Sequence, residues 1–372
     1  MDFLLESISL IGWKNVLMWA IGGLLIFLAI KKDMEPALLL PMGIGAILVN
    51  IPLSNVLTDE KGLVGIIDWM FQKGIEDSEA LPILLFIGIG AMIDFGPLLK
   101  NPKMFFLGGA AQFGIFLTIL LATIIGFQMN DSAAIGIIGA ADGPTSILVA
   151  TALESNFLGA ITVVAYSYMA LVPIIQPFVI KLITTKKERC IKMKYNAHSV
   201  SKLTKILFPI VVIIVSGIIA PKSLALIGFL MFGNLIRECG VLDTLSNTAQ
   251  NQLVNLITLL LGIIISSQMT AEKFATIQTL IIMLLGLGAF VFDTVAGVMA
   301  AKLMNVFSKE KINPMIGAAG ISAFPMSARV IQKMGLKEDK TNHLLMHAIG
   351  VNVSGQIASA IVGGLIIGLI II

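Results

Sequence analysis

Long apolar runs alternate with short polar stretches along the whole chain, and most runs approach the ~20 residues that a helix needs to cross a bilayer. We predict membrane segments near 14–30, 36–53, 81–99, 104–127, 132–153, 158–183, 203–220, 222–238, 253–267, 274–300, 312–328 and 343–372. The composition agrees, because a chain that is 57% hydrophobic with a mean hydropathy of +0.97 lies outside the range of soluble domains. We therefore expect an all-α polytopic membrane protein.

Charged residues predict how these segments are oriented, because Lys and Arg gather on the cytoplasmic side of a membrane. The densest basic stretch is 181–205, where eight Lys and Arg residues accompany a single acid, Glu188. The lysines at 31–32 and 100–103 also indicate the inside, whereas the acid-rich stretch 54–80 fits the outside.

The segment near 132–153 cannot cross completely under this orientation. If it did, the segment 158–183 would end outside and would carry the basic stretch with it. We therefore predict that this segment breaks or re-enters, and Gly139, Gly143 and Pro144 permit such a break. Asp142 lies at the same point, and an acid within the membrane is usually functional.

The second half of the chain is predicted to have the opposite membrane topology to the first half. Counted on from the basic stretch, the segment 312–328 must enter and leave from the cytoplasm, and "IGAA" at 138–141 recurs at 316–319. Paired broken segments in opposite orientations are typical of inverted-topology repeats. We predict four parts: an N-terminal membrane helix (1–35), a first inverted repeat (36–183), a basic cytoplasmic linker with a connecting helix (184–221), and a second inverted repeat (222–372).

The two broken segments carry side chains that suit a small, hard cation. These are Asp142, Thr145 and Ser146 in the first and Asn313, Ser322 and Ser327 in the second. Together with freed backbone carbonyls they favour sodium first and a proton second. No Cys or His cluster indicates a softer metal, no nucleotide loop indicates ATP, and no basic stripe with interleaved aromatics indicates nucleic acid.

Several of these residues also have plainer interpretations. Asp142 would cap a broken helix, and Asn313 would be an N-cap before Pro314. Arg329 would be an interfacial arginine on the cytoplasmic side, since Lys333 and two further lysines follow it. A cap and a ligand can be the same residue, so these alternatives stay open.

Two other polar groups lie inside predicted spans. Tyr168 stands beside Tyr166 in the middle of a segment, and a buried tyrosine usually needs only a hydrogen-bond partner. The last segment carries a polar stripe that hydrogen bonds between helices would explain: Asn352, Ser354, Gln356 and Ser359.

Three motifs resemble one family of membrane proteins. They are "GAADGPTSI" (139–147), "YSYMALVPIIQP" (166–177) and "NPMIGAAGISAFPMSAR" (313–329). Together they resemble the beta subunit of sodium-pumping, biotin-dependent decarboxylases, which act on oxaloacetate, methylmalonyl-CoA, glutaconyl-CoA or malonate. The resemblance covers nearly the whole chain. It implies that sodium is held by Asp142, Asn313, Gly317 and Ser322, with Tyr168 close by, and that Arg329 is functional.

The resemblance also implies a fold and a mechanism. The two inverted repeats would form a scaffold and a moving, elevator-like core. The chain would decarboxylate carboxybiotin at its cytoplasmic face and couple this to sodium export, consuming a proton. We expect Arg329 to bind the carboxybiotin carboxylate or to tune the proton supply, and Tyr168 and Ser322 to carry the proton.

Partners and location follow from the same resemblance. Biotin would be presented by a carrier subunit and not attached to this chain. A carboxyltransferase alpha subunit, a small membrane gamma or delta subunit and further copies of this chain would complete a complex in a bacterial or archaeal cytoplasmic membrane. A secondary sodium/carboxylate symporter or sodium/proton antiporter remains the alternative from the residues alone, because such transporters also use broken helices and an acid.

Overall fold

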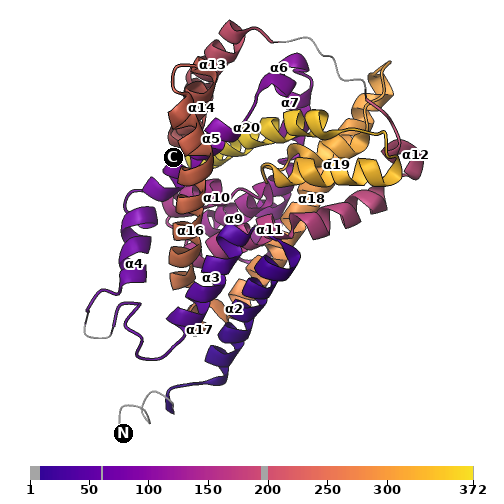
Figure 1. The fold of residues 1–372 in the computed structure, drawn as a ribbon. Helices are drawn as coiled ribbons and strands as arrows, with labels where there is room; N and C mark the ends of the chain where they lie inside the picture. The colour runs from indigo at the N-terminus through magenta and orange to yellow at the C-terminus, as the bar shows by residue number, and fades with distance from the viewer. Residues whose placement is uncertain (1–8, 60–61, 194–199, 372) are drawn as a thin grey trace.

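The computed structural model describes residues 9–59, 62–193 and 200–371, and this part of the chain is helical without a single strand (Figure 1). Part of the predicted linker, residues 194–199, lies outside it, as do residues 1–8 of the first predicted part. Seven of the described helical stretches are long and apolar enough to cross a membrane: Trp13–Lys32, Met104–Ile125, Leu158–Ile183, Lys202–Ile219, Asp243–Gln268, Ile277–Phe307 and Leu345–Ile370. The prediction of an all-α, multi-pass membrane protein is confirmed.

Most of these stretches are single helices: α2 (Trp13–Lys32), α11 (Leu158–Ile183), α13 (Lys202–Ile219), α18 (Ile277–Phe307) and α20 (Leu345–Ile370). Shorter helices complete the bundle: α3 (Pro36–Val49), α5 (Ala80–Met92) and α14 (Leu224–Cys239). In Figure 1, α20 crosses the middle of the molecule at a steep angle to α2 and α3. Small connecting helices are α4 (Ile66–Phe71), α6 (Gly96–Lys100), α12 (Lys186–Arg189) and α17 (Ala271–Phe274).

Two spans differ from their predicted form. The segment predicted at 104–127 is divided into α7 (Met104–Ala110) and α8 (Phe113–Ile125), with Gln112 as the N-cap of α8. The segment predicted at 253–267 belongs to a longer stretch made of α15 (Asp243–Thr248), a π-helical turn (Ala249–Leu253) and α16 (Val254–Ile265). The hydropathy pattern misses these features because the first interruption contains only one polar residue and the second begins with a polar helix.

Both predicted breaks are present. The first segment runs through α9 (Met129–Gly136), a 3₁₀ turn η2 (Ile137–Ala140) and α10 (Gly143–Ala152). The second runs through a 3₁₀ segment η6 (Pro314–Gly320) and then α19 (Met326–Glu338). The boundaries of the two inverted repeats stay predictions.

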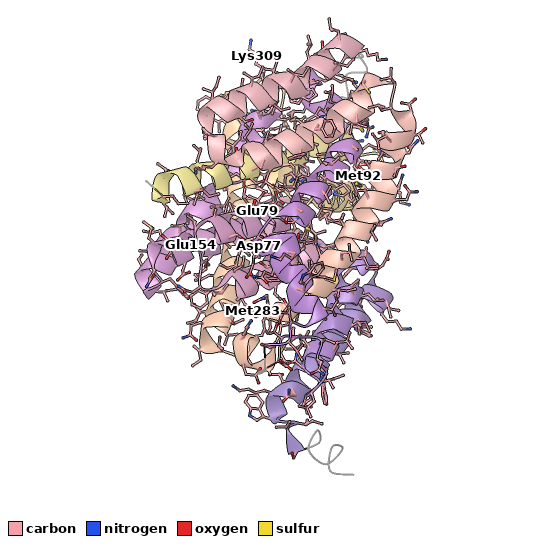
Figure 2. All side chains as sticks on the ribbon, turned by 90° about the vertical axis from the view of Figure 1, so that its left-hand side faces the viewer. Asp77, Glu79, Met92, Glu154, Met283 and Lys309 are labelled. Carbon is pink, nitrogen blue, oxygen red and sulfur yellow. The ribbon has the colours of Figure 1, made fainter. Side chains whose placement is uncertain are left out.

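Helix α18 is the element on which both broken segments pack. Gly139 of η2 lies against Ala289, and Gly317 of η6 lies against Gly297, two turns further along the same helix. In Figure 2, Met283 near the start of α18 lies low in the view, and Lys309, just beyond its end, lies at the top. This helix therefore connects the first broken segment with the second and leads on to the basic loop around Lys309.

Candidate functional site

The two broken segments touch each other directly. The backbone N–H of Ser322, just after η6, donates to the carbonyl of Ala140 at the end of η2 at 2.9 Å. Both positions are buried. Irregular backbone inside a membrane protein is tolerated only where it is buried in protein or lines a cavity, so this crossing point is the natural place to look for a site.

Asp142 stands at the break of the first segment. Ala141 before it adopts a left-handed conformation (φ +51°), which costs a non-glycine residue of the order of 1–3 kcal/mol. Asp142 itself is extended and is the N-cap of α10, with Pro144 within the first turn. Its Oδ2 atom accepts hydrogen bonds from Thr145 Oγ1 (2.7 Å), Gln356 Nε2 (3.0 Å) and Ser359 Oγ (3.2 Å).

Ser322 of the second segment reaches the same group through helix α20. Its hydroxyl donates to Ser359 Oγ at 2.6 Å and also lies 3.1 Å from the carbonyl of Gly355. Two of the predicted sodium ligands, Asp142 and Ser322, are therefore joined by one intervening hydroxyl. We call Asp142, Thr145, Ser322, Gln356 and Ser359 the central cluster.

The carbonyls of the second segment are held by side-chain amides from three other helices. Gln176 of α11 donates to Ala318 O at 2.7 Å, and Gln112 donates to Gly320 O at 3.1 Å. Asn352 of α20 donates to both Ala319 O (3.1 Å) and Ile321 O (2.7 Å). These bonds replace the helical bonds that the segment lacks, so its unwound shape is built into the fold.

Gly317 allows the backbone of η6 to lie directly against the backbone of α18. A Cβ atom added there would lie 2.0 Å from the carbonyl oxygen of Gly297, so no larger residue fits against α18. Any contribution of Gly317 to a cation site therefore comes from its backbone.

Asn313 is directed to the basic linker that follows α11. Its Oδ1 caps η6 by accepting from the N–H of Met315 at 3.1 Å. Its Nδ2 donates to the carbonyls of Arg189 (2.8 Å) and Ile191 (2.9 Å). No hydrogen bond among the described residues joins Asn313 to the central cluster, so its place among the sodium ligands stays a prediction.

Ion pairs fix the same linker to neighbouring helices. Arg189 pairs with Glu338 at 2.8 Å, Lys302 with Glu188 at 3.0 Å, and Lys192 with Asp339 at 3.0 Å. Hydrogen bonds from Thr341, together with the charge of Lys192, lower the pKa of Asp339 to about 2. The linker is thus tied to the start of the second segment and to the end of α19.

The two tyrosines of α11 point to different neighbours. The hydroxyl of Tyr168 donates to the carbonyl of Met283, and its ring packs against Gly286 of α18. Tyr166 packs against Gly143 instead, where an added Cβ would lie 2.3 Å from the ring. Tyr166 therefore lies directly against the break at Asp142, whereas Tyr168 lies beside Ile138 and α18.

Arg329 lies in the first turn of α19 and is exposed to solvent. Burial raises the pKa of the Glu35 carboxyl at the start of α3, and the charge of Arg329 opposes that rise. Arg329 is therefore near the α2–α3 connection and separate from the central cluster.

A cavity of about 820 Å³ opens beside the start of the second segment. Its basic lining residues are Lys100, Lys103, Lys192, Lys309, Lys311 and His347, against one acid, Glu310. Its apolar lining includes the adaptable side chains of Met104, Met193, Met304 and Met346. The cavity suits an anionic ligand with an apolar body.

Sequence reasoning missed several members of this arrangement. Gln356 and Ser359 belong to the polar stripe that was interpreted as interhelical bonding, and their spacing on one face of α20 was the available signal. Asp293 of α18 and Gln112 received no prediction, although an acid within an apolar run is a general signal of function. The described residues contain no group of three or more His, Cys, Asp or Glu side chains that could hold a metal ion.

Comparison with known proteins supports the motif resemblance. The family model of the Na⁺-transporting oxaloacetate decarboxylase beta subunit matches residues 14–370. The chain is 48% identical to the glutaconyl-CoA decarboxylase subunit beta of Acidaminococcus fermentans, with 96% of this chain and 94% of that protein covered.

Two further relatives extend the comparison. The methylmalonyl-CoA decarboxylase subunit beta of Propionigenium modestum is 46% identical over 95% of this chain and 94% of its own length. The oxaloacetate decarboxylase beta chain of Klebsiella pneumoniae is 43% identical over 99% and 98%. The chain therefore belongs to the family of Na⁺-transporting decarboxylase beta subunits.

Proposed function

We propose that this chain decarboxylates carboxybiotin presented by a partner subunit and uses the reaction to export sodium from the cytoplasm, consuming one proton. The observation that carries the proposal is the meeting of two broken segments at a buried carboxylate, Asp142, surrounded by hydroxyl and amide groups. Discontinuous helices that expose backbone and polar oxygens near the membrane midplane are typical of sodium transport sites.

Sodium is bound in the central cluster. The carboxylate of Asp142 supplies the charge. The hydroxyls of Thr145 and Ser359, which donate to the carboxylate, and that of Ser322, which donates to Ser359, can rotate to turn an oxygen lone pair to a cation. Asp142 and sodium together form a neutral pair, which lowers the cost of carrying the ion through a low-dielectric region. Gly317 contributes by allowing η6 to approach α18 closely.

Coupling runs through the second segment. Asn313 joins the start of η6 to the linker, so a displacement of the linker would move the segment that carries Ser322. Separating Ser322 from Ser359 would remove one oxygen from the site and weaken sodium binding in the outward state. A transporter needs such a difference in affinity between its two states.

Carboxybiotin reacts at the cytoplasmic face. The lysines of the cavity, whose lining does not include Arg329, attract the anionic carboxybiotin to this face. The guanidinium of Arg329, near the α2–α3 connection, binds the carboxylate with its two-pronged donors or tunes the proton supply. In the reaction, the bond between the ureido nitrogen and the carboxyl carbon breaks, carbon dioxide leaves, and a proton ends on the nitrogen. Ser322 and Tyr168 are the candidate hydroxyls for proton delivery.

The free energy of the reaction is adequate for this work. Moving one charge against 100 mV costs about 2.3 kcal/mol, so a decarboxylation that releases several kcal/mol can export one or two sodium ions.

The chain acts as one subunit of a larger decarboxylase complex in a membrane, as the names of its relatives indicate. We propose as its partners a biotin carrier, a carboxyltransferase alpha subunit, a small gamma or delta membrane subunit and further copies of itself. The bacterial or archaeal cytoplasmic membrane is the proposed location.

The decisive experiment measures decarboxylation of free carboxybiotin by the purified chain, alone and with its partner subunits, as sodium is titrated. We expect sodium-stimulated release of carbon dioxide, and retention of the complex on an avidin column through the biotinylated partner. A sodium symporter or antiporter, which would use the same broken helices, would instead transport sodium when reconstituted alone and would pass through the column.

A further inference from the structure

A second buried carboxyl group lies close to the central cluster but outside it. Asp293 is in the middle of α18, and its side chain is 0% exposed. It contacts the first broken segment through Gly139, and Gly297, one turn further along α18, contacts the second broken segment through Gly317. Asp293 therefore lies on the helix face that supports both breaks.

One oxygen of Asp293 has an evident structural role. Oδ1 accepts a hydrogen bond from the N–H of Gly114 at 2.5 Å. Gly114 belongs to the first turn of α8, where a negative charge is favoured by the helix N-terminus. Capping of α8 thus accounts for Oδ1.

Capping of α8 does not explain the position of the other carboxylate oxygen of Asp293, Oδ2. Oδ2 is buried and has no hydrogen-bond partner among the described residues. It is turned toward the unwound part of the first segment, because a Cβ added at Gly139 would lie only 2.5 Å from it. A buried carboxylate oxygen without a partner is unfavourable in a membrane protein unless a cation or a proton joins it.

The side-chain oxygen of Gln112 is also buried without a hydrogen-bond donor among the described residues. Gln112 is the N-cap of the same helix, α8, and this oxygen is its Oε1. Its Nε2 holds Gly320 O of the second segment. The break between α7 and α8 therefore carries a neutral oxygen acceptor without a donor, two residues before the Gly114 N–H that donates to Asp293.

Asp131 provides the contrast. It is also a buried aspartate, 3% exposed, at the start of the first segment. Its Oδ1 accepts from Ser155 Oγ (2.7 Å) and from the N–H of Asn156 (2.9 Å), and its Oδ2 accepts from Asn156 Nδ2 (3.2 Å). Both oxygens are satisfied, as expected of a structural carboxylate.

We propose that Asp293 binds a second sodium ion, with its Oδ2 atom, which is turned toward Gly139 of the first broken segment, as the charged ligand. The proposal rests on the proposed function, since it assumes that the chain transports sodium. It adds a site that is separate from the central cluster. The site lies on the face of α18 that packs against both broken segments.

The test compares isosteric variants in the purified full-length chain. Asp293→Asn keeps an oxygen that accepts from Gly114 and removes only the charge, and Asp131→Asn is the matched control. Equilibrium binding of radioactive sodium is measured per chain. We expect two equivalents for the wild type and for Asp131→Asn, and one for Asp293→Asn and for Asp142→Asn.

Thermal unfolding with and without sodium keeps the test informative if binding is hard to quantify. Without sodium, Asp293→Asn should unfold at the wild-type temperature or above it, because an unpaired charge has been removed. With sodium, it should gain less stability than the wild type, since ligand stabilisation follows the number of bound ions.

Two results would overturn the proposal. One is a single sodium equivalent in the wild type. The other is two sodium equivalents in Asp293→Asn, and if that variant also loses the pH dependence of decarboxylation, Asp293 is a proton site. The proposed function fails separately, if the wild type with its partners shows no sodium-stimulated decarboxylation of carboxybiotin.

Discussion

The two broken segments contain the same four residues, "IGAA", at their breaks, but the fold uses them differently. The first, around 138–143, carries an acid at its break, and that acid collects hydroxyl and amide donors. The second, around 313–322, carries no acid. Its carbonyls are held by amides from other helices, and its first residue, Asn313, is bound to the linker.

This difference fits a division of labour under the proposed function. The first segment would supply the charge that holds a cation, and the second would transmit movement between the linker and the site. The two tasks need different chemistry, because a ligand must keep its oxygens available whereas a mechanical connection must have its hydrogen bonds satisfied. Similar sequence at two breaks therefore does not imply that both breaks bind the ion in the same way.

Removing the charge of Asp142 from the first segment should cause the largest loss of sodium-dependent decarboxylation. Asp142→Asn is expected to lower sodium-dependent carboxybiotin decarboxylation by about 100-fold or more, since loss of one partner of a buried ion pair costs roughly 3–5 kcal/mol. Turnover is measured against sodium concentration, with Asp131→Asn as the control for a buried aspartate. Wild-type sodium affinity in Asp142→Asn would remove this residue from the site.

Asn313 distinguishes the two roles within the second segment. Asn313→Ala loses two hydrogen bonds to the linker, each worth about 1 kcal/mol, so turnover should fall roughly 10- to 30-fold. The sodium concentration for half-maximal rate should stay within about twofold of the wild type if Asn313 only transmits movement. A loss of sodium affinity comparable to that of Asp142→Asn would instead make Asn313 a ligand, as the family resemblance implies.

Arg329, near the end of the second motif, tests whether the cytoplasmic side of that segment meets the substrate. Arg329→Lys keeps the charge but loses the two-pronged geometry, so we expect roughly tenfold lower decarboxylation of carboxybiotin with normal membrane insertion. Lys333→Arg, on the same helix, should have no effect. Equal turnover in Arg329→Lys and the wild type would favour a purely interfacial arginine.

The smallest expected effect is a difference in stability between alanine variants of one glycine from each segment. Gly317→Ala places a methyl group against the backbone of Gly297, whereas Gly143→Ala places it against the ring of Tyr166, which can shift. Both should destabilise the protein by about 1–3 kcal/mol, with Gly317→Ala the worse of the two.

Gly228→Ala is the control for the glycines, because an added Cβ there meets nothing within 4 Å. Thermal unfolding in detergent ranks the three variants. A Gly143→Ala variant less stable than Gly317→Ala would show that the first segment is the more rigidly packed.

Several features of the protein follow from the sequence alone. Apolar runs of membrane length and the distribution of lysines predict an all-α membrane bundle, because hydrocarbon and the positive-inside rule act on composition, not on contacts. The breaks near Gly143 and Pro314 follow from local backbone chemistry. Asp142 is a candidate site residue for the same reason, as an acid inside an apolar run.

Only the tertiary structure decides which polar groups meet. Gln356 and Ser359 follow Asp142 by more than 200 residues, and their contact with it depends on how α20 crosses the broken segments. Tyr166, not Tyr168, faces the break because residues two apart lie on nearly opposite sides of a helix. Asn313 turns to the linker, and one oxygen of Asp293 is left without a partner, since hydrogen-bond satisfaction is a property of the assembled neighbours and is not encoded in any local stretch of chain.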